Sequence, residues 1–227
     1  MDFPVKEYTD SVKRYDGRIK LLDQTLYDLC RGHPNHSNPA EVHAKLWIIA
    51  RTLASGLEKK VHKTAEKKQG GGLRSVEDAL LKSRPKMDEI FGTLRTIAEP
   101  SSENLATIVR MHGELSRILT CATGGRSARS FVSKYMHFHN PVVPIYDSLA
   151  VKGIKAIKIP SPSKGASRAV VGVSGDEKYA QFVLRFYQLY EAAKRLLPSS
   201  DEGLTKRLDY FLIHKAEGRA SKRKRTR

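Results

Sequence analysis

Apolar residues recur along most of this chain at intervals of three and four positions, the spacing that places them on one face of an α-helix. The clearest repeats lie at residues 9–29, 38–57, 75–91, 102–119 and 176–196, with a shorter one at 204–213. No segment alternates apolar and polar residues over several positions, as a half-buried β-strand does. The sequence therefore predicts an all-α fold.

Capping residues support two of these helices. Asn38 is followed by Pro39 and Glu41, the arrangement of an N-cap, a proline at the first helical position and a glutamate at the third. Asp176 stands at the N-cap position of the repeat at 176–196. We therefore expect both helices to begin at these residues.

The length of 227 residues fits one compact helical unit. We expect residues 1–215 to form this unit, with 152–175 as a long loop because that segment is rich in Lys, Ser, Pro and Gly. Residues 216–227 end in a run of Lys and Arg, which predicts a basic, disordered tail.

Charge narrows the choice of partner. The chain has 41 Lys and Arg against 24 Asp and Glu, a net charge of +17. Such an excess favours a polyanion, with nucleic acid first and an anionic membrane surface second. One basic run is predicted to be either a solvated helix face or a phosphate-contacting surface; it consists of Lys59, Lys60, Lys63, Lys67 and Lys68.

Composition also predicts the compartment. No apolar run approaches the roughly 18 residues that cross a bilayer, and the first residues do not have the pattern of a secretory signal peptide. The two cysteines, Cys30 and Cys121, are too few for a four-cysteine zinc or iron–sulfur site. We expect a cytoplasmic protein with no membrane partner.

A helix, a tight glycine turn and a second helix are predicted around residue 124. The first helix ends near 121 and the second runs from about 127 to 139. This arrangement can present backbone N–H groups and flanking arginines to phosphate, although two glycines before a helix are equally well explained as a structural turn. The predicted phosphate-binding residues are Thr123, Gly124, Gly125, Arg126, Ser127 and Arg129.

Asp147 is the candidate catalytic residue. It follows the glycine turn by about twenty residues and heads another predicted helix. A carboxylate at that position can cap the helix, or it can stabilise the positive charge that develops on a sugar when its glycosidic bond breaks. The two roles are compatible with each other.

This order of hairpin, helix, short loop and aspartate resembles the helix–hairpin–helix DNA glycosylase superfamily over residues 103–155. The segments from His137 to Pro141 and from Pro144 to Ser148 are also similar to bacterial proteins distantly allied to it. The resemblance implies a two-lobed helical fold and a monomer that acts on double-stranded DNA without a metal or an organic cofactor. It further implies that the enzyme flips a base out, cleaves its N-glycosidic bond and leaves an abasic site.

The chain departs from the family pattern at several points. Its two turn glycines are adjacent rather than separated by an apolar residue, the loop to Asp147 is about two residues longer, and the cysteine cluster of the iron–sulfur members is missing. Ser127 stands where bifunctional members carry a nucleophilic lysine, so the resemblance implies a monofunctional enzyme. Lys134 is the remaining lysine that could give lyase activity.

Several side chains are candidates for the pocket of the flipped base, which needs aromatic faces and hydrogen-bonding edges. Each has an alternative role in the core or in a surface ion pair. The candidates are Trp47, Arg51, Lys134, Tyr135, His139 and Tyr146. His137 and His139 point to different sides of their helix, so no shared metal site is expected there.

Two further possibilities stay open at this stage. The chain can be a non-enzymatic helix–hairpin–helix protein that binds DNA or RNA, with Asp147 serving only as a cap. If it is a glycosylase, its substrate is either a damaged base or a bulky modified base such as a hypermodified phage cytosine, which would make it a defence enzyme.

Overall fold

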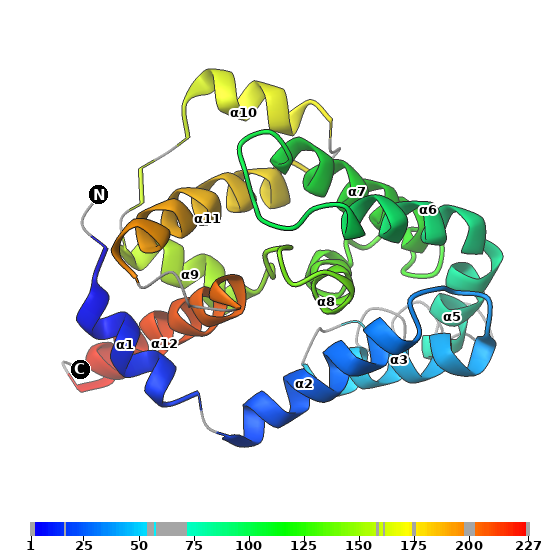
Figure 1. The fold of residues 1–227 in the computed structure, drawn as a ribbon, viewed down its shortest axis with the longest axis horizontal. Helices are drawn as coiled ribbons and strands as arrows, with labels where there is room; N and C mark the ends of the chain where they lie inside the picture. Colours follow the sequence, from blue (N-terminus) through cyan, green and yellow to red (C-terminus); the bar gives the residue numbers. More distant parts are fainter. Residues whose placement is uncertain are drawn as a thin grey trace.

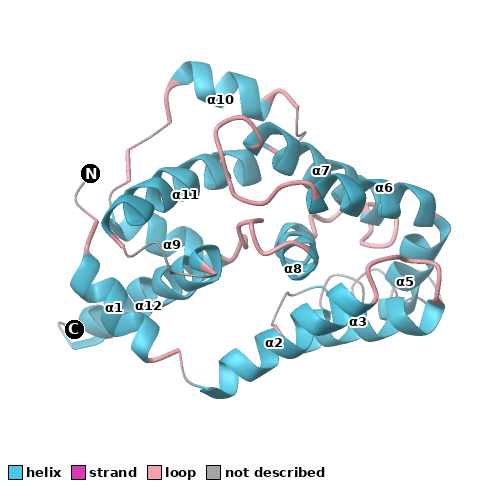
Figure 2. Ribbon diagram, in the orientation of Figure 1, coloured by secondary structure: helices cyan, strands magenta, loops and turns pink. Residues whose placement is uncertain are grey.

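The computed structural model describes residues 3–15, 17–53, 57, 72–157, 159–160, 162–173, 176–197 and 203–225. Within these residues every regular element is a helix, which confirms the predicted all-α class (Figure 1 and Figure 2). The helices are α1 (Val5–Lys13), α2 (Gly17–Gly32), α3 (Pro39–Thr52), α5 (Gly72–Lys82), α6 (Arg84–Arg95), α7 (Leu105–Leu119), α8 (Arg129–His139), α9 (Ser148–Ile157), α10 (Lys164–Val171), α11 (Glu177–Leu196) and α12 (Leu204–Arg225). The basic run at Lys59–Lys68 lies outside the described residues.

Both predicted caps are present. The side chain of Asn38 accepts a hydrogen bond from the N–H of Ala40 at the start of α3. The side chain of Asp176 accepts one from the N–H of Tyr179 at the start of α11. Each bond satisfies one of the N–H groups that a helix start leaves unpaired.

Four predicted boundaries are wrong. The repeat at 9–29 is two helices, because α1 turns its buried side chains toward one hydrophobic cluster and α2 toward another. The repeat at 75–91 is also divided, and α6 begins with a proline in its first turn. The predicted loop at 152–175 contains the end of α9 and all of α10, which Ser163 caps. The segment 216–227, predicted as a separate disordered tail, instead continues α12 as far as Arg225.

The core consists of two hydrophobic clusters that share α7. The first cluster gathers residues from α2, α3, α5, α6 and α8, and the second gathers residues from α1, α9, α10, α11 and α12. Ile108 and Leu115 of α7 belong to the first cluster, whereas Leu105 and Val109 belong to the second. Figure 1 shows α8 end-on in the middle of the molecule, with α2 and α3 on one side and α9 and α12 on the other.

Close packing of α9 on α12 holds the second cluster together. A Cβ atom at Gly153 of α9 would lie only 2.1 Å from the carbonyl oxygen of Leu212 of α12. Since real side chains never approach a backbone oxygen this closely, glycine is required for the two helices to pack at this distance. This contact holds the first half of α12 against the middle of α9, the helix that follows Asp147.

Candidate active site

The loop between α8 and α9 is fixed by side-chain hydrogen bonds to its backbone. Asn140 ends α8, and its amide nitrogen donates to the carbonyls of Leu94 at 2.5 Å and Ile97 at 2.9 Å. Its amide oxygen accepts from the N–H of Val142 at 3.1 Å. Because Asn140 is 6% exposed, these bonds form away from competing water. The three hydrogen bonds of Asn140 therefore fix the position of the loop that runs from the end of α8 toward Asp147.

The second anchor of this loop is Ser133 in the middle of α8. Its hydroxyl is 0% exposed and accepts a hydrogen bond from the N–H of Tyr146 at 2.9 Å. Tyr146 packs against the second cluster, and Val143 belongs to the first. Asp147 therefore lies where the chain crosses from one cluster to the other.

The two carboxylate oxygens of Asp147 have different partners. Oδ1 accepts a hydrogen bond from the N–H of Leu149 at 2.8 Å, so Asp147 caps α9 as predicted. Oδ2 lies 3.3 Å from Nζ of Lys134, whose side chain is only 8% exposed. The Lys134 ammonium also donates to the carbonyl of Leu53 at 2.6 Å. The Asp147 side chain remains 21% exposed, so it is held in place and still accessible.

Three charged residues that sequence reasoning missed extend this site. Lys206 of α12 lies 3.5 Å from Oδ2 of Asp23 on α2 and 3.7 Å from Oδ2 of Asp209 on α12. Asp209 is 3% exposed, and its Oδ1 has no hydrogen-bond partner among the described residues. The three residues form a buried charged group between the two clusters.

Electrostatics couple this group to Asp147. The pKa of Asp209 is raised to about 6, mainly by burial; the charges of Lys206 and Lys134 lower it, and those of Asp147 and Asp23 raise it. A carboxyl group with such a pKa exchanges its proton near neutral pH, which suits general acid–base chemistry. The sequence could have identified Asp209 as a candidate, because this acidic residue lies next to Leu208 on the apolar side of the helix predicted at 204–213.

His137 of α8 lies next to this charged group, on the side of α2, and its ring is neutral. Nδ1 of His137 lies 2.7 Å from the carbonyl of Val143, so it carries the proton, and Nε2 accepts from the hydroxyl of Tyr27 at 2.5 Å. Burial lowers the pKa of His137 to about 3, with a further contribution from the charge of Lys206. His137 is therefore a structural link between α8 and α2 rather than a proton carrier at neutral pH.

The glycine turn does not present its amides to a ligand. The N–H groups of Thr123, Gly124, Gly125 and Arg126 each donate to a carbonyl within residues 119–123. Gly124 and Gly125 have φ angles of 59° and 75°, the left-handed conformation with which helices commonly end. The turn therefore closes the end of α7, and the predicted phosphate contact through these four amides is corrected.

Arg129 is also engaged within the protein. Its Nε lies 2.9 Å and 2.7 Å from the two carboxylate oxygens of Asp176, and its guanidinium lies 5.0 Å from the centre of the Tyr146 ring. Arg129 therefore links α8 to the cap of α11 instead of projecting toward a phosphate. Of the predicted phosphate-binding side chains, Arg126 and Ser127 are exposed.

The predicted base pocket is only partly assembled. Lys134 contacts Asp147, and Tyr146 precedes it in the chain. Tyr135 is 0% exposed, and its hydroxyl lies 3.1 Å from Nε2 of His36 in the first cluster, so its assignment to the pocket is wrong. Phe131 and Phe138 share its face of α8, and this face packs into the core.

The other three predicted pocket residues lie elsewhere. His139 stacks on Phe91 with ring centres 4.1 Å apart and lines a separate cavity. The Arg51 guanidinium lies 4.1 Å from the centre of the Trp47 ring, so these two residues pair with each other on α3. None of the three has a described contact with Asp147.

The charged side chains of the site are two lysines, Lys134 and Lys206, and three aspartates, Asp23, Asp147 and Asp209. No group of three or more potential metal-ligating side chains comes together in the described part of the chain. None of the helices described there is long and apolar enough to cross a membrane. Comparisons of the chain with protein-family models, curated proteins and solved structures give no match.

Proposed function

We propose that this chain is a monofunctional DNA N-glycosylase that removes a flipped-out base by hydrolysis. The observation that carries the proposal is the Asp147 carboxylate, held between the N–H of Leu149 and the buried ammonium of Lys134 while 21% exposed. Breaking an N-glycosidic bond builds positive charge on the sugar, and a carboxylate fixed in advance stabilises that charge without reorganising. The resemblance of residues 103–155 to helix–hairpin–helix glycosylases points to the same residue.

Lys134 orients Asp147, because its ammonium lies 3.3 Å from Oδ2 of the carboxylate. A lysine nucleophile has to attack as the free amine. The Lys134 nitrogen donates to two oxygens, those of Asp147 and Leu53. Attack on a sugar carbon would require it to leave both partners, which supports hydrolysis over lyase chemistry. Asp209 is suited to take a proton from the attacking water or to give one to the leaving base.

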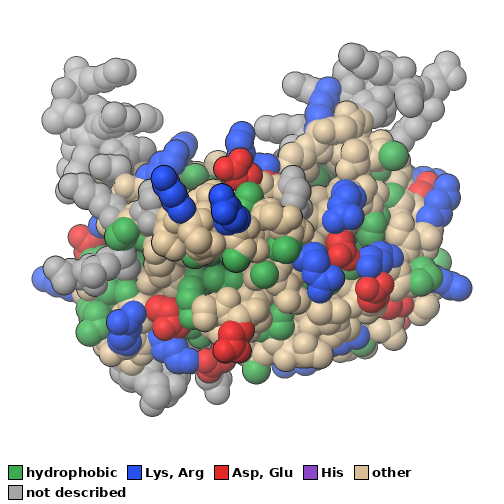
Figure 3. All heavy atoms as spheres, turned by 90° about the horizontal axis from the view of Figure 1, so that it is seen from above, with side chains coloured by type: hydrophobic (Ala, Val, Ile, Leu, Met, Phe, Trp, Pro, Cys, Tyr) green, Lys and Arg blue, Asp and Glu red, His purple; other side chains and the backbone are tan. Residues whose placement is uncertain are grey.

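In this proposal, DNA approaches the junction of the two clusters, where Asp147 lies. The net charge of +17 supports a nucleic-acid partner. Exposed Arg126 and the first turn of α8 are the candidate phosphate contacts in place of the glycine turn. On the face seen in Figure 3, the described Lys and Arg side chains lie among acidic ones and do not gather into one patch.

The test compares wild type with Asp147→Asn on duplexes that carry single damaged bases or hypermodified cytosines. Asparagine caps helices as well as aspartate does, so the variant keeps the fold while removing the charge. Abasic sites are detected by strand cleavage in alkali. We expect wild type to release at least one of these bases and the variant to bind the same duplex without releasing it.

A second function is favoured by one observation: both oxygens of Asp147 already have partners within the protein. This satisfied state suits a purely structural cap in a non-enzymatic DNA- or RNA-binding protein. Wild type that binds nucleic acid but releases no base from any duplex would support that function and refute the glycosylase. Competition between DNA and RNA at a fixed salt concentration identifies the preferred polymer.

A further inference from the structure

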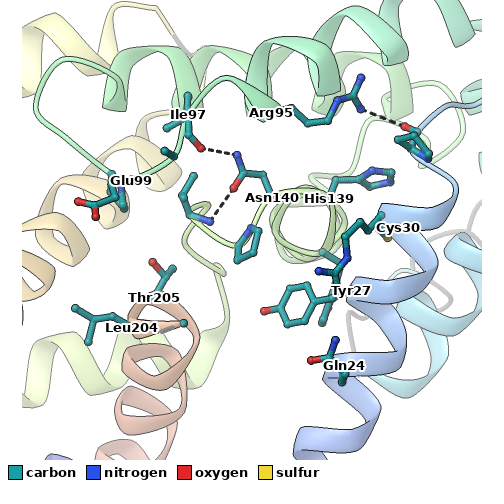
Figure 4. A pocket seen from close by; sticks show the side chains of 18 of the residues that line it. Gln24, Tyr27, Cys30, Arg95, Ile97, Glu99, His139, Asn140, Leu204 and Thr205 are labelled. Carbon is teal, nitrogen blue, oxygen red and sulfur yellow. Dashed lines mark hydrogen bonds between the residues drawn. The ribbon is translucent and has the colours of Figure 1, made fainter. Parts of the chain in front are cut away.

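A cavity lies between α2 and α12, at the end of α8 that is opposite the glycine turn (Figure 4). Its volume is about 950 Å³, and its walls come from α2, residues 95–100, residues 138–142, Tyr190 and the start of α12. Asp147, Lys134 and Asp209 are not among the residues that line it. A cavity of this size with a few converging polar groups is typical of a small-molecule site.

The N-terminus of α12 faces this cavity. Gly203, with a φ angle of 78°, Leu204 and Thr205 all line it. The first N–H groups of a helix have no partner within the helix, and together with the helix dipole they favour an anion. A helix start alone does not make a binding site, but here a buried side chain points to the same ligand.

That side chain is Thr205. It is 5% exposed, and its hydroxyl forms no hydrogen bond within the described part of the chain. Figure 4 shows Thr205 pointing from the start of α12 into the cavity. Because Thr205 lines the cavity, a ligand or water there can complete the hydrogen bonds of its hydroxyl. Thr205 and the adjacent amides are together arranged to bind a phosphate.

The opposite wall of the cavity carries cationic and aromatic groups. Figure 4 shows Arg95, His139 and Tyr27 on this side. Arg95 reaches the carbonyl of Pro34 only at 3.5 Å, and Nε2 of His139 is buried without a hydrogen-bond partner among the described residues. Burial and the neighbouring charges of Lys45 and Arg95 lower the pKa of His139, so its ring is neutral and offers one donor or acceptor.

We propose that this cavity binds a nucleoside 5′-phosphate. The phosphate lies at the N-terminus of α12 against the Thr205 hydroxyl, and the base lies against Tyr27 with its polar edge toward His139 and Arg95. The ligand is either a free mononucleotide or the 5′-phosphorylated end of a strand. The site does not use Asp147, so it stands independently of the glycosylase proposal.

Isothermal titration calorimetry on the full chain tests the proposal. The ligands are the four deoxynucleoside 5′-monophosphates, the matching nucleosides and inorganic phosphate. A trinucleotide with and without a 5′-phosphate distinguishes the two sources. We expect at least one mononucleotide to bind more tightly than its nucleoside and more tightly than inorganic phosphate.

Matched variants locate the ligand. Thr205→Val keeps the shape of the side chain but removes the hydroxyl, and it should weaken binding about tenfold, the effect of losing one hydrogen bond to a charged group. Thr205→Ser should bind as wild type does. Arg95→Met, a change at an exposed position, should weaken binding of the base without unfolding the chain. Circular dichroism melting curves show that each variant is folded.

Four results would overturn the proposal. The first is that no mononucleotide binds. The second is that inorganic phosphate binds as tightly as the mononucleotide does. The third is that Thr205→Val and Arg95→Met both bind as wild type. The fourth is loss of binding in Asp147→Asn, which would place the ligand at the other site. Failure of base release leaves all these measurements unaffected, so the two proposals fail separately.

Discussion

Replacing Asp209 with asparagine should stabilise the protein, and the gain should depend on pH. Asparagine has the shape of a protonated aspartate but never carries its charge. The groups that face Asp209 are Lys206 on its own helix, Lys134 on α8, Asp147 before α9 and Asp23 on α2. Their charges partly cancel, which leaves burial as the dominant influence on its pKa.

The magnitude follows from the difference between the folded and unfolded states. The pKa of Asp209 rises from its ordinary value of 3.8 to about 6 in the fold. At about 1.4 kcal/mol per pH unit, keeping this carboxyl charged inside the protein costs about 3 kcal/mol. Because the folded state holds the proton more tightly, the stability that Asp209 contributes is complete below about pH 4 and is lost as the pH rises through about 6.

Urea denaturation at about pH 4, 6 and 8 measures this difference, because these values lie below, at and above the pKa of Asp209 in the fold. We expect the free energies of unfolding of Asp209→Asn and wild type to be similar at the lowest pH. The variant should be more stable by up to about 3 kcal/mol at the highest pH. A difference that stays constant across the three pH values, or that shrinks as the pH rises, would refute the assignment of a raised pKa to Asp209.

Three further predictions test the fold and the site. Gly153→Ala should destabilise the protein by about 1–3 kcal/mol in thermal unfolding, because the added Cβ would lie 2.1 Å from the Leu212 carbonyl; an unchanged melting temperature would contradict the close packing of α9 on α12. Lys134→Met should abolish base release, and borohydride should trap no adduct between DNA and wild type, whereas a wild-type adduct would identify a lyase. A double-mutant cycle of Arg129→Met and Asp176→Asn should give a coupling of about 1–3 kcal/mol, since these side chains are 19% and 13% exposed; additive effects would show that the pair contributes nothing.

The helices with clear periodicity and caps were predictable from the sequence. The repeat at 176–196 corresponds to α11, Glu177–Leu196, because Asp176 satisfies the first N–H groups and apolar residues continue on one face to the end. The break between α1 and α2 was not predictable in this way. The repeat continues through it, and only the packing of the two helices on different clusters separates them.

The glycine turn shows why position was easier to predict than function. Gly124 and Gly125 were correctly placed between two helices, and their positive φ angles explain why glycine is needed there. The sequence does not determine the direction of their N–H groups. The same pair of glycines can present its amides to a ligand or return them to the carbonyls at the end of the preceding helix, and here they do the latter.

On α8, neighbouring positions were harder to separate. Lys134 and Tyr135 are adjacent in sequence, but successive side chains on a helix point about 100° apart. Tyr135 shares its face with Phe131 and Phe138 and lies in the core, while Lys134 reaches Asp147. Helical periodicity applied to all of 127–139 would have assigned the aromatic residue to the core and the lysine to the site.

The strongest signal that the sequence offered and that was not used lies on α12. Thr205 and Asp209 are four residues apart, so they occupy one face of the helix about 6 Å apart along its axis. Both residues are buried, at 5% and 3% exposure, beside Leu208 and Leu212, and Oδ1 of Asp209 has no hydrogen-bond partner in the described part of the chain. Unpaired polar atoms on the buried face of a helix lower the stability of the fold. The cost at Asp209 is that of a carboxyl buried without its full set of hydrogen bonds, whereas Thr205, one turn away, faces the cavity at the start of α12, where a ligand or water can reach it.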